Sequence, residues 1–301
     1  MTDPLFVLAP GRTYTSVLCG MLGQHPRLYT FPELYLTVAE NMWGWWLRCG
    51  RGRTNLHHGL LRSVAQIFFG AQTEETIAEA WGWIRARFDW ETSAVFRALT
   101  EQVKPRISIE KSPALVNREE FLARLLENFP NAHFLHITRH PRGTCESMLK
   151  FDTAATALSY HSVGYDFSTD PPTLDPQMWW YESHKRIDDF VARLPPERRY
   201  HLHGENFMTE PRKHLRLILK WLNLPSGTKI IEDMMHPERS PYACFGPPSA
   251  RFGNDHGYLE SPQFRPYRAK TESLEGPLPW RPDGCGFLLE VRELARKYGY
   301  T

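Results

Sequence analysis

The chain has 301 residues, enough for one large domain or two small ones, and 42% of them are hydrophobic, so a sizeable core can form. Its 36 Lys and Arg residues nearly balance 34 Asp and Glu residues, which gives a formal net charge of +2. That balance argues against nucleic-acid binding by bulk charge but is compatible with a local basic pocket. The 10 tryptophans and 24 prolines suggest long ordered loops and a pocket lined by aromatic rings.

The first apolar run, residues 5–9, has the pattern of a short strand buried on both faces. Three later runs share this pattern, and each of the four is followed by a segment with helical apolar spacing. The strands are predicted over 5–9, 106–110, 132–138 and 199–203, and the helices over 16–24, 117–128, 141–150 and 210–222. Strands that alternate with helices predict an α/β fold in which helices flank a central parallel sheet.

A long segment, about 36–104, separates the first two predicted strands and has helical patterns throughout. Thr73 is predicted as the N-cap of one of these helices, because two glutamates follow it in the first turn. Six tryptophans fall in this helical insertion, either as the core of a helical cap or as the lining of an acceptor pocket: Trp43, Trp45, Trp46, Trp81, Trp83 and Trp90.

The last part of the chain is less regular. Residues 236–284 are rich in proline, glycine and aromatics without periodicity, and a final helix is predicted over 285–298. Irregular segments of this length are more often functional than inert. Because the sequence contains no linker-like stretch, we expect residues 1–301 to form a single domain.

The N-terminus and the cysteines indicate the expected compartment. The apolar run at residues 5–9 is too short for a signal peptide, and no window approaches the roughly 18 apolar residues that span a bilayer. The five cysteines form no CxxC pair, so neither a zinc site nor a disulfide framework is indicated. We therefore expect a cytoplasmic protein without a metal site and without membrane contact.

The loop after the first strand, residues 10–16, precedes a helix N-terminus, where free backbone N–H groups bind anions. It lacks the Lys-Ser or Lys-Thr pair of nucleoside-triphosphatase loops, so ATP hydrolysis is not expected. Arg12, together with the hydroxyls of Thr13, Thr15 and Ser16, suits a phosphate or sulfate without a metal ion. The alternative is that Thr15 or Ser16 is only an N-cap.

A second basic position follows the third predicted strand. Arg139 lies at the carboxyl end of this strand, where open α/β sheets place their ligands. Ser147, eight residues later, falls inside the next helix, and an arginine with a serine can hold a phosphate dianion. Arg142 is either a further anion ligand or a solvated surface charge.

In their order and spacing, these segments resemble the sulfotransferases that use 3′-phosphoadenosine 5′-phosphosulfate, over most of the chain. The resemblance implies a P-loop-like sulfotransferase fold and a site that binds this donor without a metal. Tyr14 departs from the glycine that the family commonly has, so its ring is expected to face the nucleotide or to alter the loop backbone. The implied donor ligands are Arg12, Thr13, Tyr14, Thr15, Ser16, Arg139 and Ser147.

The resemblance also assigns residues to the chemistry. Lys111, in the Glu110-Lys-Ser-Pro113 turn, matches the lysine of the family, and with Arg12 it is expected to neutralise the bridging and sulfuryl oxygens. Cytosolic members place a histidine base at the position of Pro113, so that type of base is disfavoured here. Glu33 matches the glutamate base of the tyrosylprotein and several bacterial sulfotransferases; the alternative is a carboxylate that only stabilises a helix dipole.

The acceptor is less defined than the donor. The near-neutral charge and the ring-rich insertion favour a small apolar or aromatic alcohol or phenol, and a carrier-bound hydroxyacyl chain is the alternative. A nucleotide-dependent phosphotransferase and a non-catalytic nucleotide-binding module are the competing functions. Cytosolic members have a C-terminal nucleotide-binding motif that this chain lacks, and Arg251 and Arg268 are candidates to replace it. His25 and Glu205 are expected to be structural.

Overall fold

The computed structural model describes residues 3–51, 55–150, 165–166, 170, 173–266, 272–281 and 283–301. Five strands form one parallel sheet in the order β2-β3-β1-β4-β7. Four of them coincide with the predicted strands to within one residue at each end, which confirms an α/β fold with a central parallel sheet. The strands are β1 (Leu5–Leu8), β2 (Leu28–Thr30), β3 (Ile107–Glu110), β4 (His133–Thr138) and β7 (Arg199–His203), and a separate antiparallel pair is formed by β5 (Tyr165–Asp166) and β6 (Thr173–Leu174).

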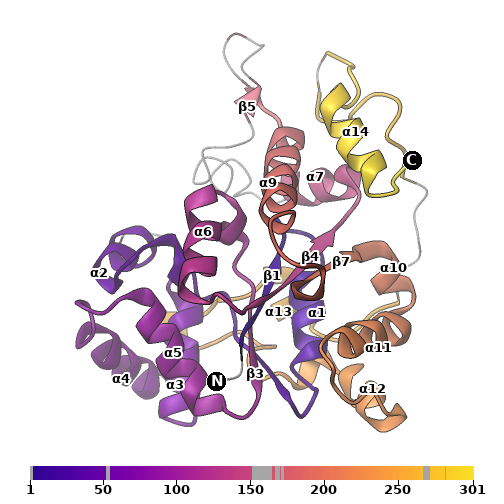
Figure 1. The fold of residues 1–301 in the computed structure, drawn as a ribbon. Coiled ribbons are helices and arrows are strands. Elements are labelled where there is room, and N and C mark those ends of the chain that lie inside the picture. Colours follow the sequence, from indigo (N-terminus) through magenta and orange to yellow (C-terminus); the bar gives the residue numbers. More distant parts are fainter. Residues whose placement is uncertain are drawn as a thin grey trace.

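Helices surround the sheet on both sides (Figure 1). In that view α2 to α5 lie to the left of the sheet, and α11 and α12 lie to the right. The helices are α1 (Thr15–Leu22), α2 (Met42–Trp45), α3 (His58–Phe68), α4 (Glu74–Arg85), α5 (Thr92–Val103), α6 (Glu119–Asn128), α7 (Pro141–Leu149), α9 (Pro176–Val191), α10 (Gly204–Thr209), α11 (Pro211–Trp221), α12 (Thr228–Met234), α13 (His256–Glu260) and α14 (Leu289–Lys297).

Strand β1 explains how the sheet acquires two buried faces. Its alternate side chains point to opposite sides, as the pleat requires. Phe6 and Leu8 join a hydrophobic cluster with α3, α5, α6 and α9, whereas Leu5 and Val7 join a second cluster with α1, α11 and α12. The continuous apolar run at residues 5–9 is therefore the consequence of burial on both faces.

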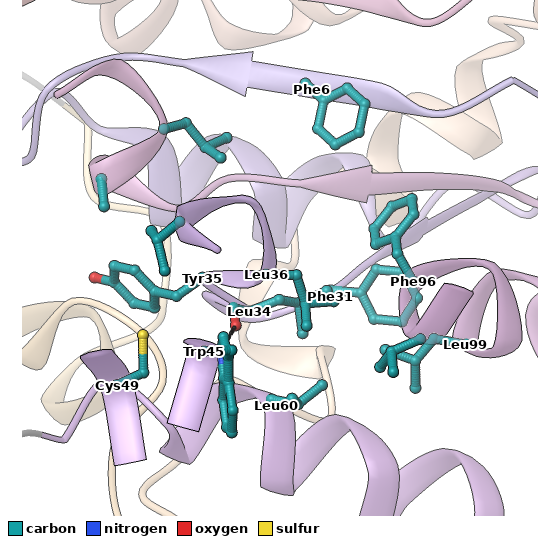
Figure 2. Packing of buried hydrophobic residues seen from close by; sticks show 14 of the residues in the cluster. Phe6, Phe31, Leu34, Tyr35, Leu36, Trp45, Cys49, Leu60, Phe96 and Leu99 are labelled. Carbon is teal, nitrogen blue, oxygen red and sulfur yellow. Dashed lines mark hydrogen bonds between the residues drawn. The ribbon is translucent and has the colours of Figure 1, made fainter. Parts of the chain in front are cut away.

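The insertion is helical, as its pattern predicts. Thr73 caps α4 in a reciprocal capping box with Thr76. Trp45 is fully buried, and Trp46, Trp81 and Trp83 pack against the core cluster, as the cap interpretation expects. Figure 2 shows the middle of this cluster, where Trp45 contacts the segment around Leu34.

Several elements escape the sequence patterns, among them β2 and α9. Strand β2 has only three residues, too few for a periodicity to register. Helix α9 has sixteen residues and an N-cap, Asp175, whose side chain accepts a hydrogen bond from the Gln177 N–H. Its buried face carries Trp179, Trp180 and the polar side chains of Gln177, Ser183 and His184, and this mixture hides the apolar stripe.

The segment 236–284 is mostly irregular in its described residues, with α13 and the 3-10 turns at Pro237–Arg239 and Pro248–Ala250 as its only regular elements there. It is followed by α14, which packs on α9 and α7 through a third hydrophobic cluster. Within the described ranges, every helix is too short or too polar to cross a bilayer.

Candidate active site

The loop between β1 and α1 has a constrained backbone. Arg12 and Tyr14 both adopt left-handed conformations, with φ of 68° and 63°, and the buried Thr13 hydroxyl between them donates to the Pro10 carbonyl at 2.7 Å. Tyr14 is the N-cap of α1, and in the described part of the chain its side chain does not cap the helix. The first N–H groups of α1 therefore face the loop, which is the geometry that binds anions.

The two arginines of the predicted donor site lie next to each other. Arg12 Nε donates to Ser147 Oγ at 3.0 Å, and an Arg139 amino group donates to the Arg12 carbonyl at 2.8 Å. Burial, with Arg139 alongside, lowers the pKa of the Arg12 guanidinium to about 10. Arg139 Nε is buried and has no hydrogen-bond partner among the described residues. Two adjacent guanidinium groups, of which Arg139 has a buried N–H without a partner among the described residues, fit a phosphate or sulfate.

Lys111 connects the loop to the predicted base. Its ammonium donates to Ser16 Oγ at 2.9 Å and pairs with Glu33 Oε1 at 2.6 Å. The Tyr35 hydroxyl donates to the other oxygen of the same carboxylate at 3.0 Å. The Lys111 side chain is 2% exposed and that of Glu33 is 15% exposed, so the pair is shielded from bulk water, although the carboxylate still reaches the pocket.

A pocket of about 470 Å³ opens at the carboxyl ends of β1, β2 and β4, the edge where parallel sheets bind ligands. Seven of the nine predicted site residues line it. The other two, Lys111 and Ser147, each contact one that does. The seven are Arg12, Thr13, Tyr14, Thr15, Ser16, Glu33 and Arg139.

One wall of the pocket comes from the irregular segment 236–284, which its length and lack of periodicity indicate as functional. Its residues were not predicted individually; they are Asp255, Gly257, Tyr258, Ser261, Gln263 and Arg265. Asp255 pairs with the Arg12 guanidinium, so a carboxylate of the chain already contacts an arginine of the predicted donor site. Local pattern could not identify these residues, since they lie far along the sequence from the loop that they face.

Tyr14 keeps the loop conformation in spite of its side chain. The left-handed backbone there is the one that glycine adopts most easily. The Tyr14 ring lies under the Arg139 guanidinium, 4.6 Å from it, and against Gly204, where an added Cβ would come within 3.0 Å of the ring. The Tyr14 hydroxyl oxygen is buried, the ring packs against the Arg139 guanidinium, and the residue also lines the pocket.

Several other predicted positions lie outside the pocket. Arg142 does not line the pocket; its side chain donates to the carbonyls of Ser273, Glu275 and Pro277 and thereby anchors that loop. Arg251 stacks on Phe245, away from the lining, and Arg268 lies outside the described residues.

The two residues expected to be structural are indeed held in structural contacts. Glu205 accepts from the His140 N–H and the Tyr300 hydroxyl, and His25 bonds to the Pro225 carbonyl. In the described part of the chain, the pocket lining includes no tryptophan; Trp179, however, packs just behind the loop, 3.8 Å from the position of a Cβ built on Gly11.

Glu110 is a further buried carboxyl beside the site. It accepts from the Ser112 hydroxyl and, at 3.3 Å, from the Leu34 N–H. Burial raises its pKa to about 7. Sequence reasoning did not single out Glu110, because its function depends on contacts across 76 residues. No group of three or more His, Cys, Asp or Glu side chains within the described ranges is arranged to hold a metal ion.

Comparisons with known proteins agree with this architecture. Residues 4–228 match the model of a family described as the Sulfotransferase family. The sulfotransferase domain from the curacin biosynthetic pathway superposes with a TM-score of 0.73 at 18% identity, covering 100% of this chain and 99% of that one. The sulfotransferase domain from the Synechococcus PCC 7002 olefin synthase gives 0.70 at 22% identity, covering 100% and 97%. A search of curated proteins found no match.

Proposed function

The chain belongs to the sulfotransferase family, and we propose that it transfers a sulfuryl group from 3′-phosphoadenosine 5′-phosphosulfate to the hydroxyl of a small apolar or aromatic acceptor. When bound, the donor supplies an activated sulfuryl group and a stable phosphate leaving group. The residues of the chain bind it, orient it, and move one proton.

The donor side of the proposal is supported by the loop and the two arginines. The N-terminal N–H groups of α1 and the Thr15 and Ser16 hydroxyls suit the 5′-phosphosulfate end. Arg139 and Ser147 suit the 3′-phosphate, with Arg139 held in place by the Tyr14 ring below it. A network that is buried, cationic and partly unsatisfied is built for a multiply charged anion.

Glu33 is the proposed general base. Its carboxylate pairs with the Lys111 ammonium and reaches the pocket, so it can take the proton of an acceptor hydroxyl. The new O–S bond then forms on the acceptor as the S–O bond to the 5′-phosphate breaks, and the bridging oxygen leaves with the electron pair. Lys111 and Arg12 stabilise the negative charge that develops there.

The observation that carries the proposal is the position of Lys111. One ammonium group contacts both Ser16 of the donor loop and Glu33. It therefore connects the leaving-group side of the site to the proton-accepting side. An ion pair with a purely structural role would not need a contact to the anion-binding loop.

The decisive experiment replaces Glu33 with Gln. Loss of the base is expected to lower kcat by at least about 10²-fold, since general-base catalysis contributes 10²–10⁴. Turnover is measured as sulfuryl transfer by mass spectrometry across a panel of hydroxylated acceptors. Affinity for 3′-phosphoadenosine 5′-phosphate, measured by calorimetry, should change little, because Glu33 contacts Lys111 rather than the arginines.

Glu40→Gln is the matched control, because Glu40 is an exposed carboxylate whose side chain is 83% exposed and which pairs only loosely with Arg124. It should behave as the wild type does. Full turnover by Glu33→Gln would exclude Glu33 as the base, and the absence of nucleotide binding by the wild type would exclude the function as a whole. Phosphate transfer that requires magnesium would favour a phosphotransferase, and binding without any turnover would favour a nucleotide-binding module.

A carrier-bound hydroxyacyl chain is the second acceptor that we propose to test. Both structurally similar domains belong to biosynthetic assemblies, the curacin pathway and an olefin synthase, and both match along the full length of this chain. The acceptor panel therefore includes each hydroxyacyl compound both free and attached to a carrier protein. A preference of at least about tenfold in kcat/KM for the attached form would assign the carrier-bound class.

A further inference from the structure

The backbone around Glu33 is held at three consecutive positions by two different parts of the chain. The Glu33 N–H donates to the Gly253 carbonyl at 2.7 Å. The Leu34 N–H donates to Glu110 at 3.3 Å, and the Tyr35 N–H donates to Ser112 Oγ at 2.9 Å. Such complete fixation of an irregular segment is unusual for a loop that only connects two elements.

Gly59, in the first turn of α3, lies directly against the peptide of Glu33. A Cβ built on Gly59 would overlap the Glu33 carbonyl oxygen and would lie 2.8 Å from its carbonyl carbon. These are backbone atoms, which cannot rotate away as the end of a side chain can. Any side chain at position 59 must therefore displace either the Glu33 peptide or α3.

Gly253 completes the contact from the other side. Its φ of 116° is strained for any residue with a side chain, and a Cβ there would lie 2.8 Å from Gly59 Cα. Helix α3 is in turn clamped to the Gly253 segment, because His58 accepts from the Phe252 N–H and the buried Arg62 donates to the Phe252 carbonyl. The helix and the segment therefore hold the Glu33 peptide together.

The residues after Glu33 cannot yield easily either. Leu34 and Tyr35 are buried in the core, and Figure 2 shows Leu34 beside Trp45, whose indole N–H donates to the Leu34 carbonyl at 3.2 Å. A displacement imposed at Glu33 is thus directed towards its exposed side, the pocket. The 2.6 Å contact between Glu33 and Lys111 would change first.

We propose that Gly59 and Gly253 are positioning residues for Glu33. Gly59 belongs to the insertion and Gly253 to the irregular segment, and because neither has a side chain, their backbones fix the position at which the Glu33 carboxylate contacts Lys111. The inference rests on the proposed base role for its kinetic consequence, whereas its structural consequence is independent of that role. It gives the insertion and the irregular segment a direct part in the chemistry.

The kinetic test compares Gly59→Ala with Gly82→Ala. Gly82 belongs to α4 of the same insertion and has open space at its Cβ position, so its substitution is a matched control. We expect Gly59→Ala to lower kcat by about 10²-fold, as a misplacement near 1 Å does, with the affinity for 3′-phosphoadenosine 5′-phosphate unchanged within about twofold. In a Glu33→Gln background, Gly59→Ala should cause no further loss, because the two changes act on the same group.

The structural test uses the ligand-free protein. With 15N-labelled lysine, the Nζ signal of Lys111, assigned by its loss in Lys111→Met, should shift in Gly59→Ala and stay in place in Gly82→Ala. Gly253→Ala is the second variant, in case Gly59→Ala does not fold. Its added methyl meets Gly59 rather than Glu33, and we expect the same decrease in kcat and the same shift of the Lys111 signal. A folded variant that matches Gly82→Ala in both kcat and the Lys111 signal overturns the inference. A wild type without sulfuryl transfer overturns only the proposed function, since the Lys111 signal still tests the positioning.

Discussion

Asp255 contacts Arg12 inside the pocket and thus places a negative charge where an anionic ligand is proposed to bind. Binding of a phosphosulfate would have to displace this carboxylate or approach it against electrostatic repulsion. The same side chain also caps α13 through the Tyr258 N–H, at 3.1 Å. Asp255 would therefore weaken the binding of an anionic ligand, while it stabilises the helix that forms one wall of the pocket.

Asp255→Asn separates these two effects, because asparagine is an equally good N-cap but carries no charge. We expect about three- to tenfold tighter binding of 3′-phosphoadenosine 5′-phosphate, with the smaller value reflecting the partial exposure of the pair. Calorimetry at low and high salt measures the change, which should shrink at high salt. Weaker binding by Asp255→Asn would mean that Asp255 orients Arg12 for the ligand instead.

The surroundings of Tyr14 could be predicted from the sequence only in part. Its departure from glycine is visible in the sequence, but the partner of its ring is not. The backbone is left-handed at the N-cap of α1, and the ring packs against the Arg139 guanidinium. The outcome depended on Gly204, which leaves room for the ring and is 190 residues away.

At the scale of elements, local signals predicted helices well where caps and periodicity agree. Thr73 with two glutamates after it marked the start of α4, and the structure has a capping box there. Helix α9 was missed because polar side chains share its buried face. Its position matters for the site, since the Trp180 indole donates to the Arg139 carbonyl at 3.0 Å.

Thr73→Ala tests the cap of α4. Loss of the hydroxyl leaves the Thr76 N–H without its partner, and we expect about 1 kcal/mol less stability in urea unfolding, with kcat unchanged. Glu79→Ala, on the exposed face of the same helix, should change stability by only a few tenths of that amount. Equal stability of the two variants would mean that the capping box contributes nothing measurable.

At the scale of the whole molecule, buried ionisable groups come from distant parts of the chain, among them Glu110, His140 and His184. Burial lowers the pKa of His140 to about 4 and that of His184 to about 3, and the His184 ring is hydrogen-bonded to His136 at 2.8 Å. Glu110 is shifted the other way, to about 7. These shifts connect the stability of the fold to pH.

Stability is therefore expected to fall as the pH decreases below about 6.5. Between that pH and about 4, the unfolded chain protonates His140 and His184 while the folded chain does not, so protons favour unfolding. Glu110 has the opposite effect on the free energy of unfolding. In the folded protein its carboxyl keeps its proton up to about pH 7, whereas in the unfolded chain it loses the proton at lower pH. The stabilisation that Glu110 contributes is therefore lost as the pH rises. Burial also lowers the pKa of His58 and His136, and it raises the pKa of Glu272, so the shifted histidines outnumber the shifted carboxyls and the free energy of unfolding decreases towards acid pH.

Urea unfolding at pH 7, 6 and 5 measures this slope, and Glu110→Gln should make it steeper by removing the opposing contribution. A free energy of unfolding that stays constant or increases from pH 6.5 to pH 5 would contradict the assignment of neutral, buried histidines.

The sequence by itself determined the parts of this protein that depend on local chemistry. Strand-like runs predicted four strands, although in β7, at the edge of the sheet, only Leu202 is buried. An arginine among hydroxyls before a helix predicted the loop between β1 and α1. A strand, a turn and a helix terminus are each made by neighbouring residues. Only the tertiary structure decided how distant residues meet. Lys111 reaches Glu33 across 78 residues and Ser16 across 95, because the sheet places β3 between β1 and β2. Asp255 and the glycine contacts at Glu33 depend in the same way on packing that no local pattern records.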